Sequence, residues 1–346
     1  MRAWPVEGTD AGGSRASIRG RGGAAAALAT PLRIAALGGG TGLPRVLAGL
    51  SSASAARPLD VTAIVTTCDD GGSSGELRRR YGMPSPGDIR NCLVALSPAP
   101  GPLADLFQHR FPGEGGLAGH TVGNVVITAL AQRLGDFGAA IRAAGELLGV
   151  RGRVLPATDR LAGLVATLDD GRVVHGESAI AAALGRVGRL QLDAPVPAPQ
   201  AALDALREAD LVVFGPGSLY SSVVATLLCD GVADALAASR AVRVLVVNLF
   251  TQPGETAGYA ASDHVRAIEH HVGLVVDAAL VQARPPPAAL VRSYAAQGSH
   301  PVAVDREELR ELGVEVVEAE LFGAGETARH DPSRLAAALL GMVGAE

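Results

Sequence analysis

The feature that most constrains this chain is an apolar stretch that runs directly into glycines and then into a helical pattern. The sequence RIAALGGGTGLPRVLAGL, residues 33–50, predicts a short buried strand and a helix, joined by a tight turn of Gly38, Gly39, Gly40, Thr41 and Gly42. Glycines permit positive φ angles and close approach of a ligand, and the following helix N-terminus favours an anion. The turn therefore indicates a phosphate-binding site, the alternative being a structural turn that binds nothing.

Strand-like and helix-like stretches alternate along the chain from residue 32 onward. Besides residues 33–38, strands are expected at 59–70, 210–218, 242–250, 274–283, 301–305 and 314–321. This alternation predicts an α/β fold with a mostly parallel sheet, right-handed crossovers and helices on both faces. Residues about 153–196 interrupt it, because their strand-like segments carry an Asp-Gly turn in LDDGRVV. We expect a small antiparallel insert there.

The first 31 residues differ from the rest of the chain. They are rich in Gly, Ala and Arg and show no periodicity, which predicts a disordered extension. Residues 32–346 are then expected to form a single domain.

Charge and cysteine content exclude several classes of function. The net charge is −5 and no basic block occurs, so no nucleic-acid partner is expected. No apolar run has the length of a membrane span. The 30 basic residues are all Arg, so lysine-dependent chemistry is excluded. The three scattered cysteines indicate a reducing cytoplasm and no zinc site.

Two carboxylates and a second small-residue turn follow the strand predicted at 59–70. Asp69 and Asp70 could take ribose hydroxyls or hold a divalent metal through oxygen ligands. The alternative is an Asx turn with a helix cap. The turn continues with further possible donors at Gly71, Gly72, Ser73 and Ser74.

Further polar residues follow other predicted strands or stand at predicted helix starts. The candidates are Asp88 and Asn91 in SPGDIRNCL, His120 and Asn124 in GHTVGNVV, Gly215, Gly217 and Ser218 in GPGSLYSS, Asn248 in NLFTQPGET, and Arg329 and His330 before the last helix. The spacing of His120 and Asn124 predicts one helix face, and Ser218 is placed to cap a helix. No Ser-His-Asp arrangement stands at a recognisable spacing. Polar turns after at least four strands predict one rim that binds a nucleotide or phosphorylated ligand.

In its motifs the chain resembles the YvcK-like gluconeogenesis factors, which share a superfamily with CofD, the 2-phospho-L-lactate transferase of deazaflavin coenzyme synthesis. The resemblance covers about residues 33–340. The matching motifs, in order, are GGGTGL, DDGGSSGELR, PGDIRNCLVAL, LFQHRF, GHTVGN, ADLVVFGPGSLYSS, NLFTQPGET and RHD.

The resemblance implies a Rossmann-like fold and a UDP-sugar ligand of the UDP-N-acetylglucosamine type. It also implies a role in cell shape and cell-wall precursor supply on gluconeogenic carbon sources. We expect a cytoplasmic homo-oligomer that binds this ligand as a regulator, with turnover left open and no certain cofactor. The alternative is a phospho-lactyl transferase in which Asp69 and Asp70 hold Mg²⁺. A pyridine-nucleotide dehydrogenase ranks last, because the glycine fingerprint is imperfect.

Overall fold

The computed structural model describes residues 30–98, 101–183, 185–274, 276–323, 325 and 327–343. Within this part, a seven-stranded sheet contains β1 (Leu32–Gly38), β2 (Leu59–Val65), β3 (Arg153–Pro156), β7 (Leu211–Phe214), β8 (Val242–Val246), β9 (Ala278–Gln282) and β10 (Glu315–Ala319). A three-stranded sheet contains β4 (Leu164–Leu168), β5 (Val173–His175) and β6 (Val187–Leu192). The extension predicted at 1–31 lies, up to residue 29, outside the described residues.

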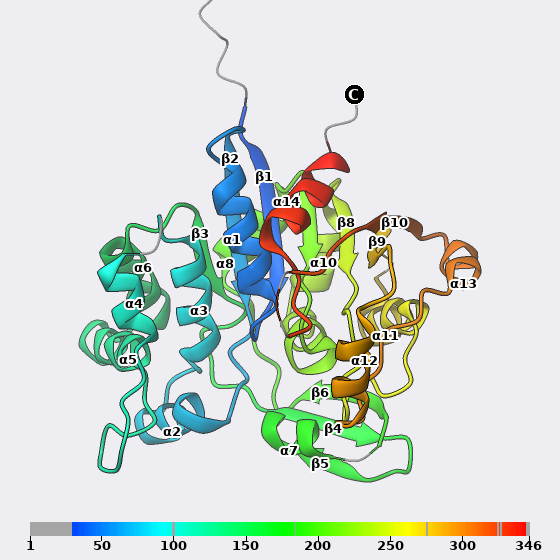
Figure 1. Cartoon of the computed structure of the whole chain (residues 1–346). Helices are drawn as coiled ribbons and strands as arrows, with labels where there is room; N and C mark the ends of the chain where they lie inside the picture. Colours follow the sequence, from blue (N-terminus) through cyan, green and yellow to red (C-terminus); the bar gives the residue numbers. More distant parts are fainter. Residues whose placement is uncertain are drawn as a thin grey trace, which may run out of the picture. The chain divides into compact units, whose positions relative to one another are not determined.

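The large sheet is parallel throughout its paired strands, in the order β10-β9-β8-β7-β1-β2-β3. From β1, the chain adds β2 and then β3 on one side, and β7 to β10 on the other (Figure 1). The strand order therefore reverses between β1 and β7. In open α/β sheets, ligands bind beyond the carboxyl ends of the strands at such a switch point.

Helices cover both faces of the large sheet, and alternate residues of β1 divide the two cores. Ile34 and Ala36 belong to one core, and Ala35 and Leu37 belong to the other. The first core includes residues of α1 (Leu43–Ala53), α3 (Gly87–Leu96), α4 (Pro102–Gln108), α5 (Val122–Leu134), α6 (Phe137–Leu148), α12 (Ala288–Ala295) and α14 (Pro332–Gly341). The second includes residues of α7 (Glu177–Ala182), α8 (Gln200–Arg207), a π-helix (Leu219–Val224), α9 (Ala225–Leu227), α10 (Val232–Ala238), α11 (Ala261–Val272) and α13 (Arg306–Glu311). The predicted α/β architecture is confirmed.

The antiparallel insert is confirmed, but it is smaller than the expected segment 153–196. β3 pairs in parallel with β2 and forms an edge of the large sheet. The insert proper is the small sheet, in the order β5-β4-β6, with α7 between β5 and β6. The strand expected at 301–305 is also wrong, since Pro301 and Ala303 make only isolated bridges.

The turns after β1 and β7 pack against each other with no room for a side chain. A Cβ atom on Gly42 would lie 1.8 Å from the carbonyl oxygen of Pro216. Gly38 has a φ of +141°, a conformation that side chains rarely adopt. The amide of Gly215 donates to the carbonyl of Leu37 at 2.9 Å. Glycine is required here for backbone-to-backbone packing.

Replacing Gly42 with Ala is expected to destabilise the fold by about 1–3 kcal/mol, because the new methyl group forces the two turns apart. Thermal unfolding of the purified variant measures this loss. Gly116→Ala is the matched control, since a Cβ there meets nothing within 4 Å. Equal melting temperatures for both variants would contradict the packing described here.

Candidate functional site

The predicted rim forms at the carboxyl ends of β1, β7 and β8. Asn248 follows β8 and holds the turn after β7 through two hydrogen bonds. Its Oδ1 accepts from the Gly217 amide at 2.9 Å, and its Nδ2 donates to the Gly217 carbonyl at 2.6 Å. The structure therefore brings together three segments that are far apart in the sequence.

A pocket of about 330 Å³ opens beside these turns. The sequence-predicted residues that line it are Thr41, Gly42, Gly217, Asn248, Arg329 and His330. Sequence reasoning missed other lining residues, namely Arg45, Phe250, Gln252, Tyr294, Gln297 and Ser299. Phe250 and Gln252 stand in the quoted motif NLFTQPGET, which could have found them. Tyr294, Gln297 and Ser299 lie in or just after α12, where no sequence signal marks them.

Two aromatic rings pack against each other in the wall of this pocket. The rings of Phe250 and Tyr294 lie 4.6 Å apart between centroids, at a tilt of 39°. The Tyr294 hydroxyl accepts a hydrogen bond from the Ala328 amide at 3.0 Å. Tyr294 therefore also holds the segment that carries Arg329 into the pocket.

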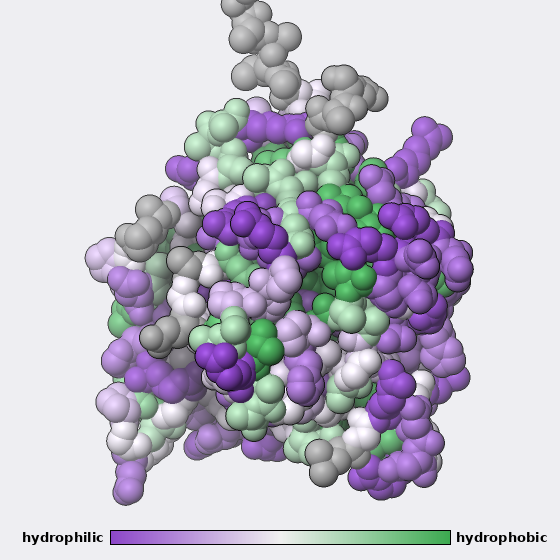
Figure 2. All heavy atoms as spheres, turned by 45° about the vertical axis from the view of Figure 1, so that its right-hand side comes forward, coloured by the Kyte–Doolittle hydropathy of each residue, from purple (hydrophilic) through white to green (hydrophobic). Residues whose placement is uncertain are grey.

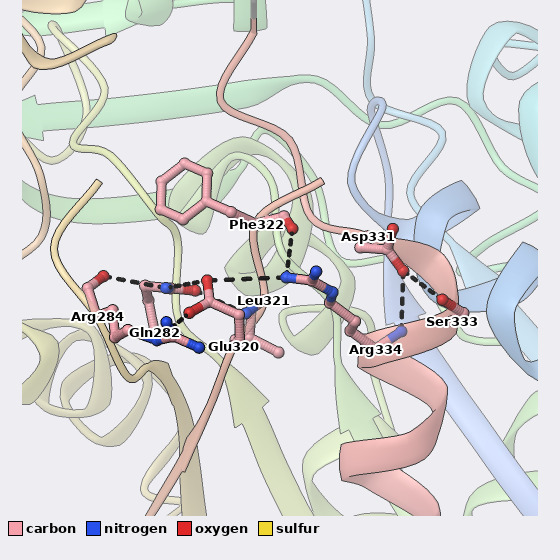
Figure 3. A network of polar contacts seen from close by, with 8 residues as sticks. All are labelled: Gln282, Arg284, Glu320, Leu321, Phe322, Asp331, Ser333 and Arg334. Carbon is pink, nitrogen blue, oxygen red and sulfur yellow. Dashed lines mark hydrogen bonds and ion pairs between the residues drawn. The ribbon is translucent and has the colours of Figure 1, made fainter. Parts of the chain in front are cut away.

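The segment with Arg329 and His330 is anchored at both ends (Figure 3). Glu320 accepts from the Gln282 amide group at 2.7 Å and pairs with Arg284 at 2.8 Å. At the other end, Asp331 caps α14 by accepting from the Arg334 amide at 3.0 Å, as the sequence predicts. The Arg334 guanidinium donates a hydrogen bond to the Phe322 carbonyl at 3.0 Å. Both predicted residues thus lie between two groups of hydrogen bonds and ion pairs.

His330 is buried at the pocket wall with one ring nitrogen unused. Burial lowers the pKa of His330 to about 4, so the ring is neutral near pH 7. The ring bonds to the backbone of Val247, and Nε2 has no hydrogen-bond partner among the described residues. An unpaired buried polar atom costs free energy. Nε2 itself is covered by protein, so other atoms of His330 border the pocket.

A second group of predicted residues lies on the other side of the β1 turn. Asp88, in the first turn of α3, accepts from the Gly40 amide at 2.7 Å. Burial, with a contribution from Asp69, raises the pKa of Asp88 to about 6. Asp69 accepts from the Gly71 amide at 2.9 Å, and Asp70 accepts from the Ser178 amide of α7 at 2.9 Å. Asp69, Asp70 and Asp88 do not line the pocket of Arg329.

The insert adds a carboxyl group that sequence reasoning missed. Glu177 begins α7 and is half-buried. Burial, followed by the charges of Asp69, Glu255, Asp70 and Asp88, raises the pKa of Glu177 to about 7. No local motif marks Glu177, because its place depends on how the insert folds back over the sheet.

The carboxylates fit a metal poorly. The two carboxylates accept hydrogen bonds from different backbone amides. Asp69 accepts from Gly71, and Asp70 accepts from Ser178 of α7. Among the described residues, no group of three or more His, Cys, Asp or Glu side chains could hold a metal ion. The magnesium site of the transferase alternative stays a prediction.

The remaining predicted residues form a network around α2 (Gly72–Tyr81). Ser73 contacts both His120 and Asn124, and Arg90 of α3 donates to Asn124 and to Asn91. The prediction of one helix face for His120 and Asn124 is wrong. His120 precedes α5, whose N-cap is Thr121, and the two residues meet at Ser73 instead.

Ser218 stands at the N-cap of the π-helix, as predicted, but it does not cap that helix with its side chain. Its side chain makes no capping hydrogen bond and accepts instead from Gln252 at 3.3 Å. The helix that follows begins as a π-helix, a form that is frequent at functional sites.

None of the described helices has the length and apolar character needed to cross a membrane. Hydrophilic residues make up most of the face seen in Figure 2, with only small separate hydrophobic areas.

Comparison with known proteins agrees with this fold. A sequence model of the family described as 2-phospho-L-lactate transferase CofD matches residues 34–322. The gluconeogenesis factor of Bacillus subtilis is 42% identical over 90% of this chain and 98% of its own length. That of Halalkalibacterium halodurans is 42% identical over 89% of this chain and 95% of its own length. The crystal structure of protein BH3568 from Bacillus halodurans, 41% identical, matches with a TM-score of 0.86 and covers 90% of this chain and 100% of that one.

The doubly wound sheet with glycine turns at its switch point is that of a CofD-type, Rossmann-like α/β protein. Within that class, the chain belongs to the YvcK-like gluconeogenesis factor family, as its motifs predict.

The raised pKa of Glu177 predicts a pH-dependent stability that a neutral side chain lacks. The folded state favours the protonated form, so ionisation costs stability as pH rises from the ordinary value of 4.5 towards about 7. The melting temperature of Glu177→Gln relative to wild type should therefore rise across this window and level off above it. The exposed Glu114→Gln is the control. A difference in melting temperature between Glu177→Gln and wild type that stays constant with pH would contradict the raised pKa of Glu177.

Proposed function

We propose that this protein binds a UDP-sugar of the UDP-N-acetylglucosamine type in the pocket at the switch point. The observation that carries the proposal is the convergence of two glycine turns, two arginines and an aromatic pair on one pocket. Arg45 and Arg329 supply fixed positive charge beside backbone amides, which suits a diphosphate. The pair of Phe250 and Tyr294 offers apolar surface for a flat base.

The proposal divides the ligand between the two sides of the β1 turn. In the proposal, the diphosphate lies on Thr41, Gly42 and Gly217. Asp88 already occupies the Gly40 amide, so Asp88 and Asp69 face the sugar rather than the phosphates, since like charges repel.

The cellular role in the proposal follows the relatives, which are named gluconeogenesis factors. Sensing of a UDP-sugar would couple carbon supply to cell-wall precursors and cell shape during growth on gluconeogenic carbon. The protein acts in this proposal as a cytoplasmic homo-oligomer.

Binding of UDP-N-acetylglucosamine should raise the melting temperature of the purified protein. A ligand that binds only the folded state adds about 2.7 kcal/mol at 100 times its Kd. Arg329→Ala should remove most of the shift, because it deletes a charge that lines the pocket. Arg133→Ala, at an exposed position on α5, should leave the shift intact. No shift at millimolar ligand would rule out the proposal.

The second candidate is a phospho-lactyl transferase, which the family description of CofD favours. Asp88 and Glu177 support it, because carboxyl groups with pKa values of about 6 and about 7 can exchange protons near neutral pH. Incubation with a lactyl diphospho-nucleoside and a deazaflavin acceptor should then give a phosphodiester product. Unchanged substrates with every added divalent metal would eliminate this candidate.

A further inference from the structure

Ser73 stands in a sequence and structural setting that neither proposed function uses. The segment Gly71-Gly72-Ser73-Ser74-Gly75 fits the pattern G-x-S-x-G. β2 ends at Val65, Gly71 is the N-cap of α2, and Ser73 lies in the first turn of that helix. In the nucleophile elbow of hydrolases, the same pattern places a serine on a tight strand-to-helix turn. Here a Cβ on Gly75 would lie 1.7 Å from the Asp70 carbonyl, so the turn requires glycine at that position. The positive φ, +45°, falls on Gly72, one residue before the serine.

Ser73 contacts His120, and His120 in turn lies beside the carboxylate of Glu76. The Ser73 hydroxyl lies 2.9 Å from Nδ1 of His120, and the other ring nitrogen of His120 lies 3.4 Å from the Glu76 carboxylate. The negative charge of Glu76 beside Nε2 favours the ring proton on that nitrogen, which leaves Nδ1 to accept the proton of Ser73. His120 is 5% exposed, whereas Glu76 is 52% exposed. Ser73, His120 and Glu76 thus follow the order of a nucleophile, a base and a carboxylate that orients the base.

Two further groups hold the serine oxygen in place. Asn124 Nδ2 donates to Ser73 Oγ at 3.1 Å, which stabilises the oxygen as its proton leaves. Arg90 donates to Asn124 Oδ1 at 2.9 Å and so fixes which end of the amide faces Ser73. The first amides of α2 lack acceptors inside the helix, as at every helix N-terminus. They lie beside Ser73, where a developing oxyanion would need donors.

A small apolar pocket adjoins the base. It has a volume of about 160 Å³ and lies between α2 and α5. His120, Leu77, Tyr81, Leu117 and Val125 line it, and the polar residues Arg80, Thr128 and Gln132 complete its wall. Leu117 is 51% exposed and Tyr81 is 42% exposed, so the pocket is open to entry. On the other side, the Asp69 carboxylate bonds to the Gly71 amide, two residues from Ser73. This surrounding favours an uncharged electrophile with an apolar group over a phosphate ester.

We propose that Ser73 is a nucleophile that cleaves uncharged carboxylic esters with a short apolar acyl chain. Ser73 Oγ attacks the carbonyl carbon while His120 Nδ1 takes its proton. The bond from that carbon to the ester oxygen breaks, and His120 returns the proton to the leaving alcohol. A water molecule then attacks the acyl-serine, with His120 again as base, and releases the carboxylic acid and free Ser73. The Glu76 carboxylate keeps the His120 ring in position.

Treatment of the full-length protein with a fluorophosphonate tests this directly, without any nucleotide. The probe should attach to Ser73 with loss of fluoride, as seen by peptide mass spectrometry, and the protein should hydrolyse p-nitrophenyl butyrate. Ser73→Ala should abolish both signals. His120→Gln should slow both about 100-fold, the scale of general-base catalysis, and Glu76→Gln should slow them less.

The control is Ser52→Ala, at an exposed serine of α1, which should behave as wild type. Melting temperatures recorded for each variant separate loss of chemistry from loss of fold. If His120→Gln fails to fold, the rates of Glu76→Gln decide, since half of that side chain is exposed. Absence of an adduct on folded wild type would overturn the proposal. So would an adduct that forms equally fast in the folded His120 or Glu76 variant.

Discussion

The contact between the turns after β1 and β7 is the constraint on which the rest of the site depends. The two strands are neighbours, and the chain leaves them in opposite directions along the sheet. Gly42 packs on the Pro216 carbonyl with no space for a methyl group, and Asn248 pins Gly217 from the next strand. Any widening of this contact would separate the amides that face the pocket. The site is therefore as rigid as the sheet that carries it.

The β1 turn separates two environments of opposite charge. On one side, Arg45 and Arg329 line a pocket whose wall contains the neutral His330. On the other, burial and neighbouring carboxylates raise the pKa values of Asp88 and of Glu177 in the insert. A ligand with a charged middle and an uncharged polar end fits such a division. The insert matters to this account because α7 contributes Glu177 and contacts Asp70 through the Ser178 amide.

Local sequence patterns predicted most of the fold and part of the site. Strand-to-helix turns such as Gly38–Gly42 and Gly215–Ser218 are visible in the sequence, because glycines and apolar runs act over a few residues. The pocket residues Tyr294 and Gln297 were not visible, since they reach the site through the packing of α12. Long-range contacts also explain the errors. His120, just before α5, contacts Ser73 at the start of α2, which a local spacing does not reveal. In the same way, β3 joins the large sheet through its pairing with β2.

The central claim is that the paired glycine turns hold the diphosphate of a nucleotide sugar. A crystal structure of the protein soaked with UDP-N-acetylglucosamine tests it most directly. The account predicts diphosphate density against Thr41, Gly42 and Gly217, with Arg329 in contact. A nucleotide bound elsewhere, with both turns free of phosphate, would contradict it.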